Sequence, residues 1–148
     1  MNQIAPSPRH ARWSELDPGT LHDLVRLRVD VFVVEQACPY PELDGRDVEA
    51  ATEHVWLADG SGPAAYLRVL AEPDGAIRVG RVCTRASARG QGLARVLMDD
   101  VLARHAGRRV VLDAQEYLVG FYTDLGFEAC GPPFDDDGIL HVPMRREP

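Results

Sequence analysis

The 148-residue chain has 16 basic residues, all of them arginine, and 23 acidic residues, which give a net charge of −7 at pH 7. This length corresponds to one domain that can bury a core without disulfide or metal support. The absence of lysine excludes Schiff-base chemistry and the lysine of a nucleotide-binding P-loop. The acidic balance argues against nucleic acid as a partner, because phosphate neutralisation needs a basic surface.

The cysteines and the apolar segments restrict the environment of the chain. Cys38, Cys83 and Cys130 form no CxxC pair, so we expect neither a disulfide framework nor a metal site. No apolar run approaches membrane-spanning length, and the N-terminus lacks the apolar centre of a signal peptide. We therefore expect a soluble cytoplasmic protein with no membrane partner. Residues 1–10 are expected to form a flexible tail and residues 11–148 a single domain.

The hydrophobic pattern of the N-terminal half predicts a strand, a helix and three further strands. Residues 11–16 are expected to form an edge strand, and Asp17-Pro18-Gly19-Thr20 to start a helix that runs to about residue 34. A loop rich in proline and acidic residues follows at 37–50. Three strands joined by short turns with glycine are then expected, in an antiparallel meander: 54–58, 64–71 and 76–84.

The C-terminal half alternates helices and strands. We expect a helix over 93–105, because apolar residues recur on one face and Gly107 follows as a stop signal. A buried strand, a second helix and two strands complete the chain, with a turn at 135–138 before the last strand: 110–114, 116–125, 127–130 and 139–144. The order β-α-βββ-α-β-α-β-β predicts an α+β fold, a mixed sheet with helices packed on it.

A basic segment without acidic residues surrounds the start of the 93–105 helix. Residues 79–98 contain four arginines, so this segment carries +4 and the rest of the chain −11. A helix N-terminus favours an anion, and Gly90 and Gly92 allow a phosphate to approach the backbone. A surface turn with scattered arginines is the alternative. A Rossmann dinucleotide site fits poorly, because Arg95 occupies the position of its third glycine.

Two motifs resemble the signatures of the GCN5-related N-acetyltransferase (GNAT) superfamily. Arg89-Gly90-Gln91-Gly92-Leu93-Ala94 is similar to its R/Q-x-x-G-x-G/A pyrophosphate loop, and Phe121-Tyr122-Thr123-Asp124-Leu125-Gly126-Phe127 is similar to its FYxxLGF motif. In the N-terminal half, residues 31–40 (VFVVEQACPY), together with Asp44-Gly45 and Asp47, resemble the ElaA-like branch. The resemblance covers nearly the whole chain after residue 10. It implies the GNAT fold, with two splayed parallel strands in a mixed sheet.

The resemblance implies acetyl-CoA as the acetyl donor, held between the strands at 76–84 and 110–114. It implies that the pantetheine arm pairs like an added strand with the backbone of three residues: Val82, Cys83 and Thr84. It places the pyrophosphate on the backbone amides of six residues: Arg89, Gly90, Gln91, Gly92, Leu93 and Ala94. Gln115 stands where many relatives have an asparagine that contacts the cofactor, and it keeps the amide.

The resemblance also implies a catalytic role for Tyr122. An amine attacks the thioester directly, and the hydroxyl of Tyr122 protonates the CoA thiolate as it departs. A backbone N–H on the splayed strand can stabilise the oxyanion that forms during attack. Without the motif, Tyr122 would be read as a core aromatic residue. Covalent acetylation of Cys83 is disfavoured, because the sequence shows no base beside it.

The acceptor amine has to lose a proton, and the sequence offers several candidate bases. Glu35, Glu53 and His54 are the candidates, each with an alternative structural role, and ordered water can serve instead. His141 is a further candidate for the acceptor pocket, because the last strand borders the acceptor site in the GNAT fold.

Arg68 and Arg81, on neighbouring expected strands, have two open interpretations. They can recognise a carboxylate on the acceptor, or they can form ion pairs with Asp44 or Asp47 and brace the 37–50 loop. We favour bracing, because a buried arginine needs a partner. The acidic residues of the loop and its surroundings suit a cationic amine: Glu42, Asp44, Asp47, Glu49 and Glu53.

The sequence therefore predicts a transferase that moves an acetyl group from acetyl-CoA to an amine of a small molecule, peptide or protein. A non-catalytic CoA-binding or interaction module on the same fold is the alternative. Transfer to a hydroxyl, or transfer of a longer acyl chain, is a third interpretation. A homodimer is open as well, since dimers are frequent in the superfamily that the chain resembles.

Overall fold

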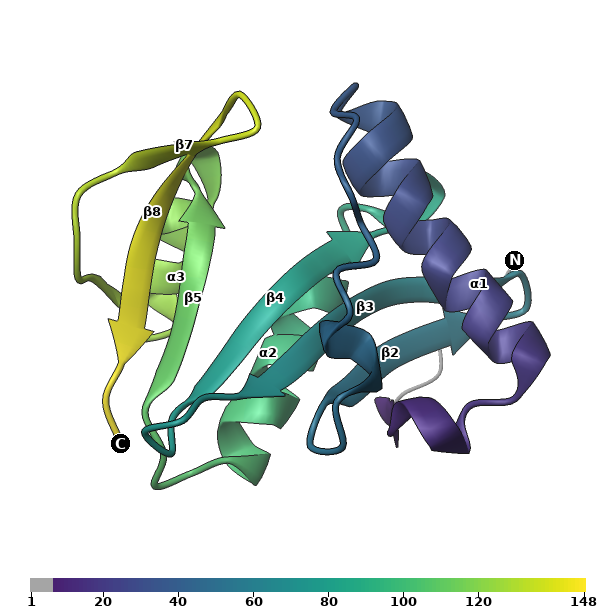
Figure 1. Ribbon diagram of the computed structural model, residues 1–148, viewed down its shortest axis with the longest axis horizontal. Helices are drawn as coiled ribbons and strands as arrows, with labels where there is room; N and C mark the ends of the chain where they lie inside the picture. The colour runs from purple at the N-terminus through teal and green to yellow at the C-terminus, as the bar shows by residue number, and fades with distance from the viewer. Residues whose placement is uncertain (1–6) are drawn as a thin grey trace.

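The computed structural model describes residues 7–148 as an eight-stranded mixed sheet with helices on both faces (Figure 1). The strands are β1 (Arg9–Ala11), β2 (Glu53–Asp59), β3 (Gly62–Ala71), β4 (Ile77–Thr84), β5 (Val110–Gln115), β6 (Glu128–Ala129), β7 (Phe134–Asp136) and β8 (Ile139–Arg146). The α-helices are α1 (Pro18–Val29), α2 (Leu93–Arg104) and α3 (Val119–Asp124). Shorter helical segments are η1 (Trp13–Glu15), η2 (Asp30–Glu35), η3 (Arg46–Val48), η4 (Ala86–Ala88) and η5 (Glu116–Leu118). The predicted α+β fold is confirmed.

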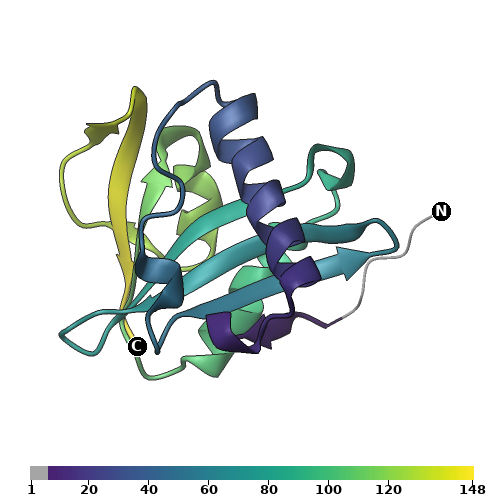
Figure 2. The same ribbon diagram turned by 45° about the vertical axis from the view of Figure 1, so that its right-hand side comes forward.

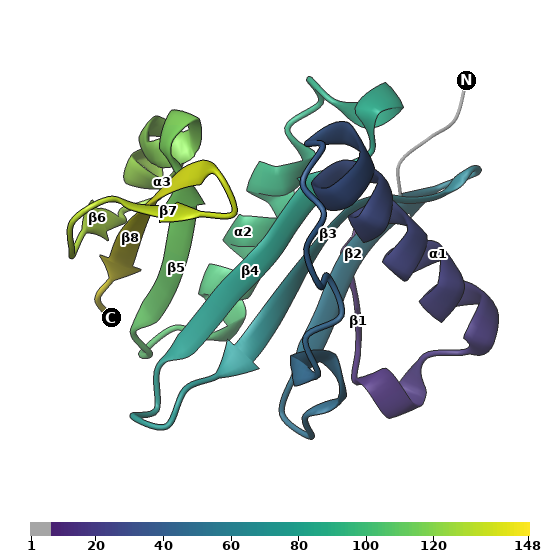
Figure 3. The same ribbon diagram turned by 45° about the horizontal axis from the view of Figure 1, so that its top comes forward.

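The only parallel pair of strands, β4 and β5, separates in the middle of the sheet that residues 7–148 form. The strand order is β1-β2-β3-β4-β5-β8-β6, with β7 paired to β8, and every pair is antiparallel except β4 with β5. β4 and β5 are in register only at Ile77–Val110 and Arg78–Val111. Beyond these residues the two strands diverge, as Figures 1 and 3 show. The backbone of β4 after Arg78 therefore has no partner on β5.

Alternating side chains of the strands supply a core on each face of the sheet, as expected for a pleated strand. On one face, α2 and α3 contribute to a large cluster that includes Leu97, Val101 and Tyr122 beside strand residues such as Leu67. On the other face, Leu24 and Leu27 of α1 and Val31 of η2 pack on a smaller cluster around Trp56, Tyr66 and Cys83. α1 crosses the face that is nearer the viewer in Figure 2, and α2 lies behind the sheet.

The first helix begins as the sequence predicts and ends in an unusual turn. The side chain of Asp17 accepts a hydrogen bond from the backbone N–H of Thr20 at 2.9 Å, which caps the N-terminus of α1. The expected helix to residue 34 is formed by α1 and η2, and η2 is a π-helix. Such widened turns are frequent at functional sites. Here η2 brings Glu35 and Gln36 to the end of β4.

A group of three arginines and three carboxylates, the arginine–carboxylate cluster, holds the 37–50 loop on the sheet, with all members but Asp44 and Arg81 buried: Arg28, Glu42, Asp44, Asp47, Arg68 and Arg81. Arg28 is only 1% exposed, and its Nε lies 2.7 Å from a carboxylate oxygen of Glu42. Its Nη1 lies 2.8 Å from Asp47. A buried arginine with two carboxylate partners is the arrangement that desolvation requires.

The two arginines with open roles belong to this cluster. Arg68 donates to Asp44 at 2.9 Å and to Asp47 at 3.2 Å. Arg81 donates to Glu42 at 2.8 Å and to Asp44 at 3.4 Å. Burial alone would raise the pKa of Asp44, but the hydrogen bond and the charge of Arg68 outweigh burial and lower it to about 2. The predicted bracing role of Arg68 and Arg81 is confirmed.

A β-bulge in β4 directs Arg81 toward this cluster. Between the pairs Arg68–Gly80 and Tyr66–Cys83, β4 has one residue more than β3. Arg81 lies in the bulge with φ of 55°, a left-handed conformation that costs a residue with a side chain roughly 1 kcal/mol. Its ion pairs with the 37–50 loop offset that strain.

The ends of the chain differ from the prediction. The expected edge strand at 11–16 is wrong, because Trp13–Glu15 forms a turn of 3₁₀-helix. The edge strand is instead Arg9–Ala11, which pairs with β2, so Arg9 and His10 do not belong to a tail. Of the rest of the predicted tail, Ser7 and Pro8 are described by the structure, and residues 1–6 lie outside the described residues.

Near the C-terminus, the sequence analysis missed β7. The turn expected at 135–138 is tighter, because Asp137 and Gly138 have φ of 51° and 84° and form a two-residue hairpin between β7 and β8. Positive φ at both central residues is typical of a type I′ turn. The helix expected at 116–125 is also divided, with η5 leading into α3.

Candidate active site

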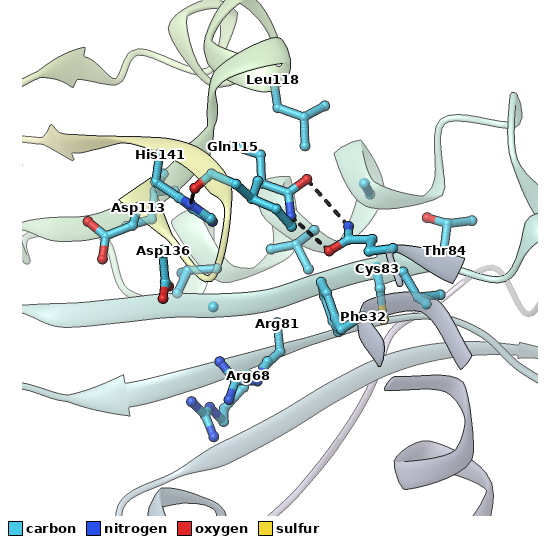
Figure 4. A pocket seen from close by; sticks show the side chains of 18 of the residues that line it. Phe32, Arg68, Arg81, Cys83, Thr84, Asp113, Gln115, Leu118, Asp136 and His141 are labelled. Carbon is cyan, nitrogen blue, oxygen red and sulfur yellow. Dashed lines mark hydrogen bonds between the residues drawn. The ribbon is translucent and has the colours of Figure 1, made fainter. Parts of the chain in front are cut away.

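A cavity of about 580 Å³ occupies the gap between β4 and β5. One wall is β4, and the opposite wall is formed by β5, β8 and the start of α3. Residues of η2 and of the 37–50 loop, such as Phe32 and Tyr40, close a third side, and Figure 4 shows Phe32 there. Arg68, Arg81, Cys83, Gln115 and His141 all contribute to the lining. The cavity therefore brings together most of the candidate residues from both halves of the chain.

One end of the cavity meets the N-terminus of α2. Arg89 and Ala94 line it there, and Gly90 and Gly92 have φ of 81° and 73°. A side chain at either glycine would be strained, although nothing lies within 4 Å of its Cβ position. Among the described residues, none accepts a hydrogen bond from the backbone N–H groups of residues 90–92, and the first N–H groups of a helix have no partner within the helix. These donors fit a diphosphate.

The residues assigned to the pantetheine arm line the same cavity. Val82, Cys83 and Thr84 lie on the part of β4 that has no partner on β5. Their backbone can therefore pair with an extended ligand as a further strand would. The side chain of Cys83 is buried, and burial raises the pKa of its thiol to about 12. A neutral thiol is a poor nucleophile, which agrees with the expectation that Cys83 does not carry the acetyl group.

Two side-chain contacts join the end of η2 to other residues that line the cavity. Glu35 forms an ion pair with Arg89 at 2.7 Å. The side-chain amides of Gln36 and Gln115 exchange hydrogen bonds at 3.4 and 3.5 Å, which Figure 4 marks with dashed lines at Gln115. The amide of Gln115 thus faces the gap, as its predicted contact with the cofactor requires.

Tyr122 lines the cavity from α3 and is 4% exposed. Phe121 and Phe127 hold its ring edge-on, with ring centroids at 5.0 and 5.9 Å. Within residues 7–148, its hydroxyl forms no hydrogen bond. Burial raises the pKa of this hydroxyl well above its usual value, so it stays protonated at neutral pH. Tyr122 is therefore a core aromatic residue whose polar end remains available to a ligand.

The structure places two of the candidate bases outside the cavity. His54 is 2% exposed, with Nδ1 2.7 Å from the hydroxyl of Tyr66 and Nε2 3.1 Å from the backbone oxygen of Asp47. Both ring nitrogens are engaged, and burial lowers the pKa of His54, so the prediction of a catalytic His54 is contradicted by its position. Glu53 lies on β2 and pairs with Arg104 and His105 at 2.9 and 2.8 Å.

The carboxylates of the 37–50 loop do not line the cavity. Glu42, Asp44 and Asp47 form ion pairs with arginines of the arginine–carboxylate cluster. Asp136 and Asp137 of the β7–β8 hairpin line the cavity instead. The sequence places them in a turn, and the Asp137-Gly138 dipeptide, which is typical of a two-residue hairpin, is the signal that sets them beside β8.

Comparison with known proteins identifies the family of this chain. Residues 21–148 match the family model described as an acetyltransferase (GNAT) domain. The chain belongs to the GNAT family. It is 36% identical over 140 residues to the protein ElaA of Escherichia coli K12, covering 90% of this chain and 92% of ElaA. A UPF0039 protein of Mycobacterium tuberculosis is 48% identical over 139 residues, covering 90% of this chain and 89% of that protein.

Solved structures agree with this GNAT membership. The crystal structure of an acyl-CoA N-acyltransferase from Pseudomonas aeruginosa has a TM-score of 0.88 and 35% identity, over 95% of this chain and 99% of that one. The crystal structure of Escherichia coli ElaA has a TM-score of 0.87 and 33% identity, over 99% of this chain and 100% of that one. The predicted superfamily and its ElaA-like branch are confirmed.

Over residues 7–148, no three His, Cys, Asp or Glu side chains are grouped so that they could hold a metal ion. In the same part of the chain, every helix is too short or too polar to cross a bilayer.

Proposed function

We propose that the protein transfers an acetyl group from acetyl-CoA to an amine acceptor. One observation carries this proposal: a single cavity connects the N-terminus of α2, where backbone N–H groups are free, with the free hydroxyl of Tyr122. Membership of the GNAT family supports the reaction class, as does the similarity to a structure described as an acyl-CoA N-acyltransferase. The catalytic role of Tyr122 and the choice of an acetyl group are part of the proposal.

The donor side of the proposed site uses the backbone more than side chains. The N–H groups of residues 90–94 would hold the diphosphate, helped by the dipole of α2. The unpaired edge of β4 at residues 82–84 would hold the pantetheine arm, and the amide of Gln115 would contact it from β5. The side chain of Arg89 is neutralised by Glu35, so we infer that Glu35 adjusts charge beside the diphosphate and does not remove the proton of the amine.

Acetyl-CoA, when bound, supplies a thioester carbon for attack by the amine. A nitrogen–carbon bond forms and the carbon–sulfur bond breaks. The sulfur takes a proton from the hydroxyl of Tyr122, and the amine nitrogen gives a proton to a base. Because burial raises the pKa of Tyr122, its hydroxyl still carries the proton when the thiolate departs.

The test is thiol release from acetyl-CoA with a panel of amines, combined with mass spectrometry of the acceptor. The panel contains ethylamine, pentylamine, 1,5-diaminopentane, 5-aminopentanoate, a peptide with a free N-terminus and a peptide with an internal lysine. We expect at least one amine to raise thiol release well above the rate without amine and to gain one acetyl group. If CoA binds but no amine is acetylated, the chain is a non-catalytic CoA-binding module and the proposal is wrong.

A further inference from the structure

The last strand places a histidine beside the amide that faces the gap. His141 on β8 is directly opposite Gln115 on β5 in the antiparallel ladder, so the two side chains share one face of the sheet. Both line the cavity, as Tyr122 does. Figure 4 shows His141 next to Gln115, with Asp113 and Asp136 nearby. His141 therefore belongs to the wall that faces the splayed part of β4.

A backbone hydrogen bond defines which nitrogen of His141 carries a proton. Nδ1 lies 2.8 Å from the carbonyl oxygen of Ile139. A carbonyl oxygen can only accept, so Nδ1 must be the donor, and in the neutral ring the lone pair is then on Nε2. Within the described chain, Nε2 forms no hydrogen bond or ion pair. Phe134 stacks on the ring, with centroids 5.8 Å apart and planes at 23°, and holds its orientation.

The charges around His141 leave this end of the cavity with a negative excess. Arg81 of β4 is paired with Glu42, and Arg78 of β4 is paired with Glu72 and Asp113. The carboxylates of Asp136 and Asp137, which come from the hairpin opposite the 37–50 loop, have no cationic partner among residues 7–148. The other titratable groups on the lining here are Tyr40, Tyr117 and Cys38, whose thiol donates to the backbone oxygen of Asp137. Arg68 also lines the cavity and is paired with Asp44 and Asp47. A cationic amine can therefore approach His141 without meeting an unpaired cation.

We propose that His141 is the general base that deprotonates the acceptor amine. The inference rests on the proposed function and names a base that it leaves open. Nε2 takes one proton from the protonated acceptor amine, so His141 becomes an imidazolium and the neutral nitrogen attacks the acyl carbon. The second proton that the nitrogen must lose passes to the oxygen of Tyr122, which has given its own proton to the departing sulfur. Nδ1 keeps its hydrogen bond to Ile139 in both states, so the ring need not turn during the transfer.

The kinetic test compares His141→Gln with wild type on amines of different basicity. Each amine of the panel that the wild type acetylates is paired with a fluorinated analogue of lower basicity, such as ethylamine with 2,2,2-trifluoroethylamine. We expect kcat/KM with the basic amine to fall by about 10²-fold or more, as for loss of a general base. With the fluorinated amine, which is already neutral, the loss should be less than about 10-fold. His22→Gln, at an exposed histidine on α1 outside the cavity, is the matched control and should change neither rate.

A spectroscopic test is independent of turnover. Long-range ¹⁵N–¹H spectra of histidine-labelled protein, with the signals of His141 assigned by their loss in His141→Gln, should show the neutral ring protonated at Nδ1. A neutral ring protonated at Nε2 would overturn the inference, and so would equal loss of rate with both amines of a pair. If the wild type acetylates no amine, the proposed function fails, and the role of His141 fails with it.

Discussion

Tyr122→Phe is expected to lower kcat for acetyl transfer by about 10²- to 10⁴-fold, which is the usual contribution of a general acid. The substitution removes only the hydroxyl, and the ring keeps its edge-on contacts with Phe121 and Phe127. The KM for acetyl-CoA and the melting temperature should therefore change little. Steady-state thiol release together with a thermal melt measures all three quantities.

The matched control for this variant is Tyr66→Phe, which removes a buried hydroxyl outside the cavity. Tyr66 is fully buried, and its hydroxyl is hydrogen-bonded to His54. We expect this control to lose about 1 kcal/mol of stability, the typical value for one hydrogen bond, with kcat unchanged. A wild-type kcat in Tyr122→Phe would show that the hydroxyl of Tyr122 is not the acid.

Gly92→Glu is expected to weaken CoA binding by at least about 100-fold, which corresponds to roughly 2.7 kcal/mol. The glutamate places a side chain and a negative charge at the N-terminus of α2, where the diphosphate would lie. The backbone at this position has φ of 73°, so the substitution also costs roughly 1 kcal/mol of folding free energy. Isothermal titration with CoA measures the affinity, and a thermal melt measures the stability.

Gly75→Glu separates these two effects. Gly75 lies in the β3–β4 turn with φ of 89° and open space at its Cβ position, and it is not part of the cavity. The same change in charge and a similar backbone strain should leave the affinity for CoA at the wild-type value. Equal affinity in Gly92→Glu and Gly75→Glu would contradict the assignment of the diphosphate to the start of α2.

The fold and the position of the glycine loop at the start of α2 could be predicted because they depend on local patterns. The start of α1 is set by Asp17 and Thr20 and the start of α2 by Gly90 and Gly92, and each is visible in a few consecutive residues. Antiparallel neighbours joined by short turns also pair in the order of the sequence. The edge strand β1 and the strand β7 were not predicted correctly, because a strand of three residues is too short to show an alternation of apolar and polar residues.

The state of the ionisable side chains in and around the cavity could not be predicted, because it depends on contacts between residues that are far apart in the sequence. In the sequence, His54 and His141 are equally plausible bases. Only tertiary contacts engage both ring nitrogens of His54 and leave Nε2 of His141 free. In the same way, Asp44 and Asp136 look alike in the sequence. Arg68 neutralises Asp44 from β3, whereas Asp136 has no such partner in the described chain.

The central claim is that the gap between β4 and β5 binds acetyl-CoA for transfer to an amine. A crystal structure of the protein with CoA tests it most directly. The account predicts the diphosphate on the N–H groups of residues 90–94, the pantetheine arm along Val82–Thr84 and the sulfur within hydrogen-bonding reach of the Tyr122 hydroxyl. CoA bound elsewhere, or with its sulfur directed away from Tyr122, would contradict it.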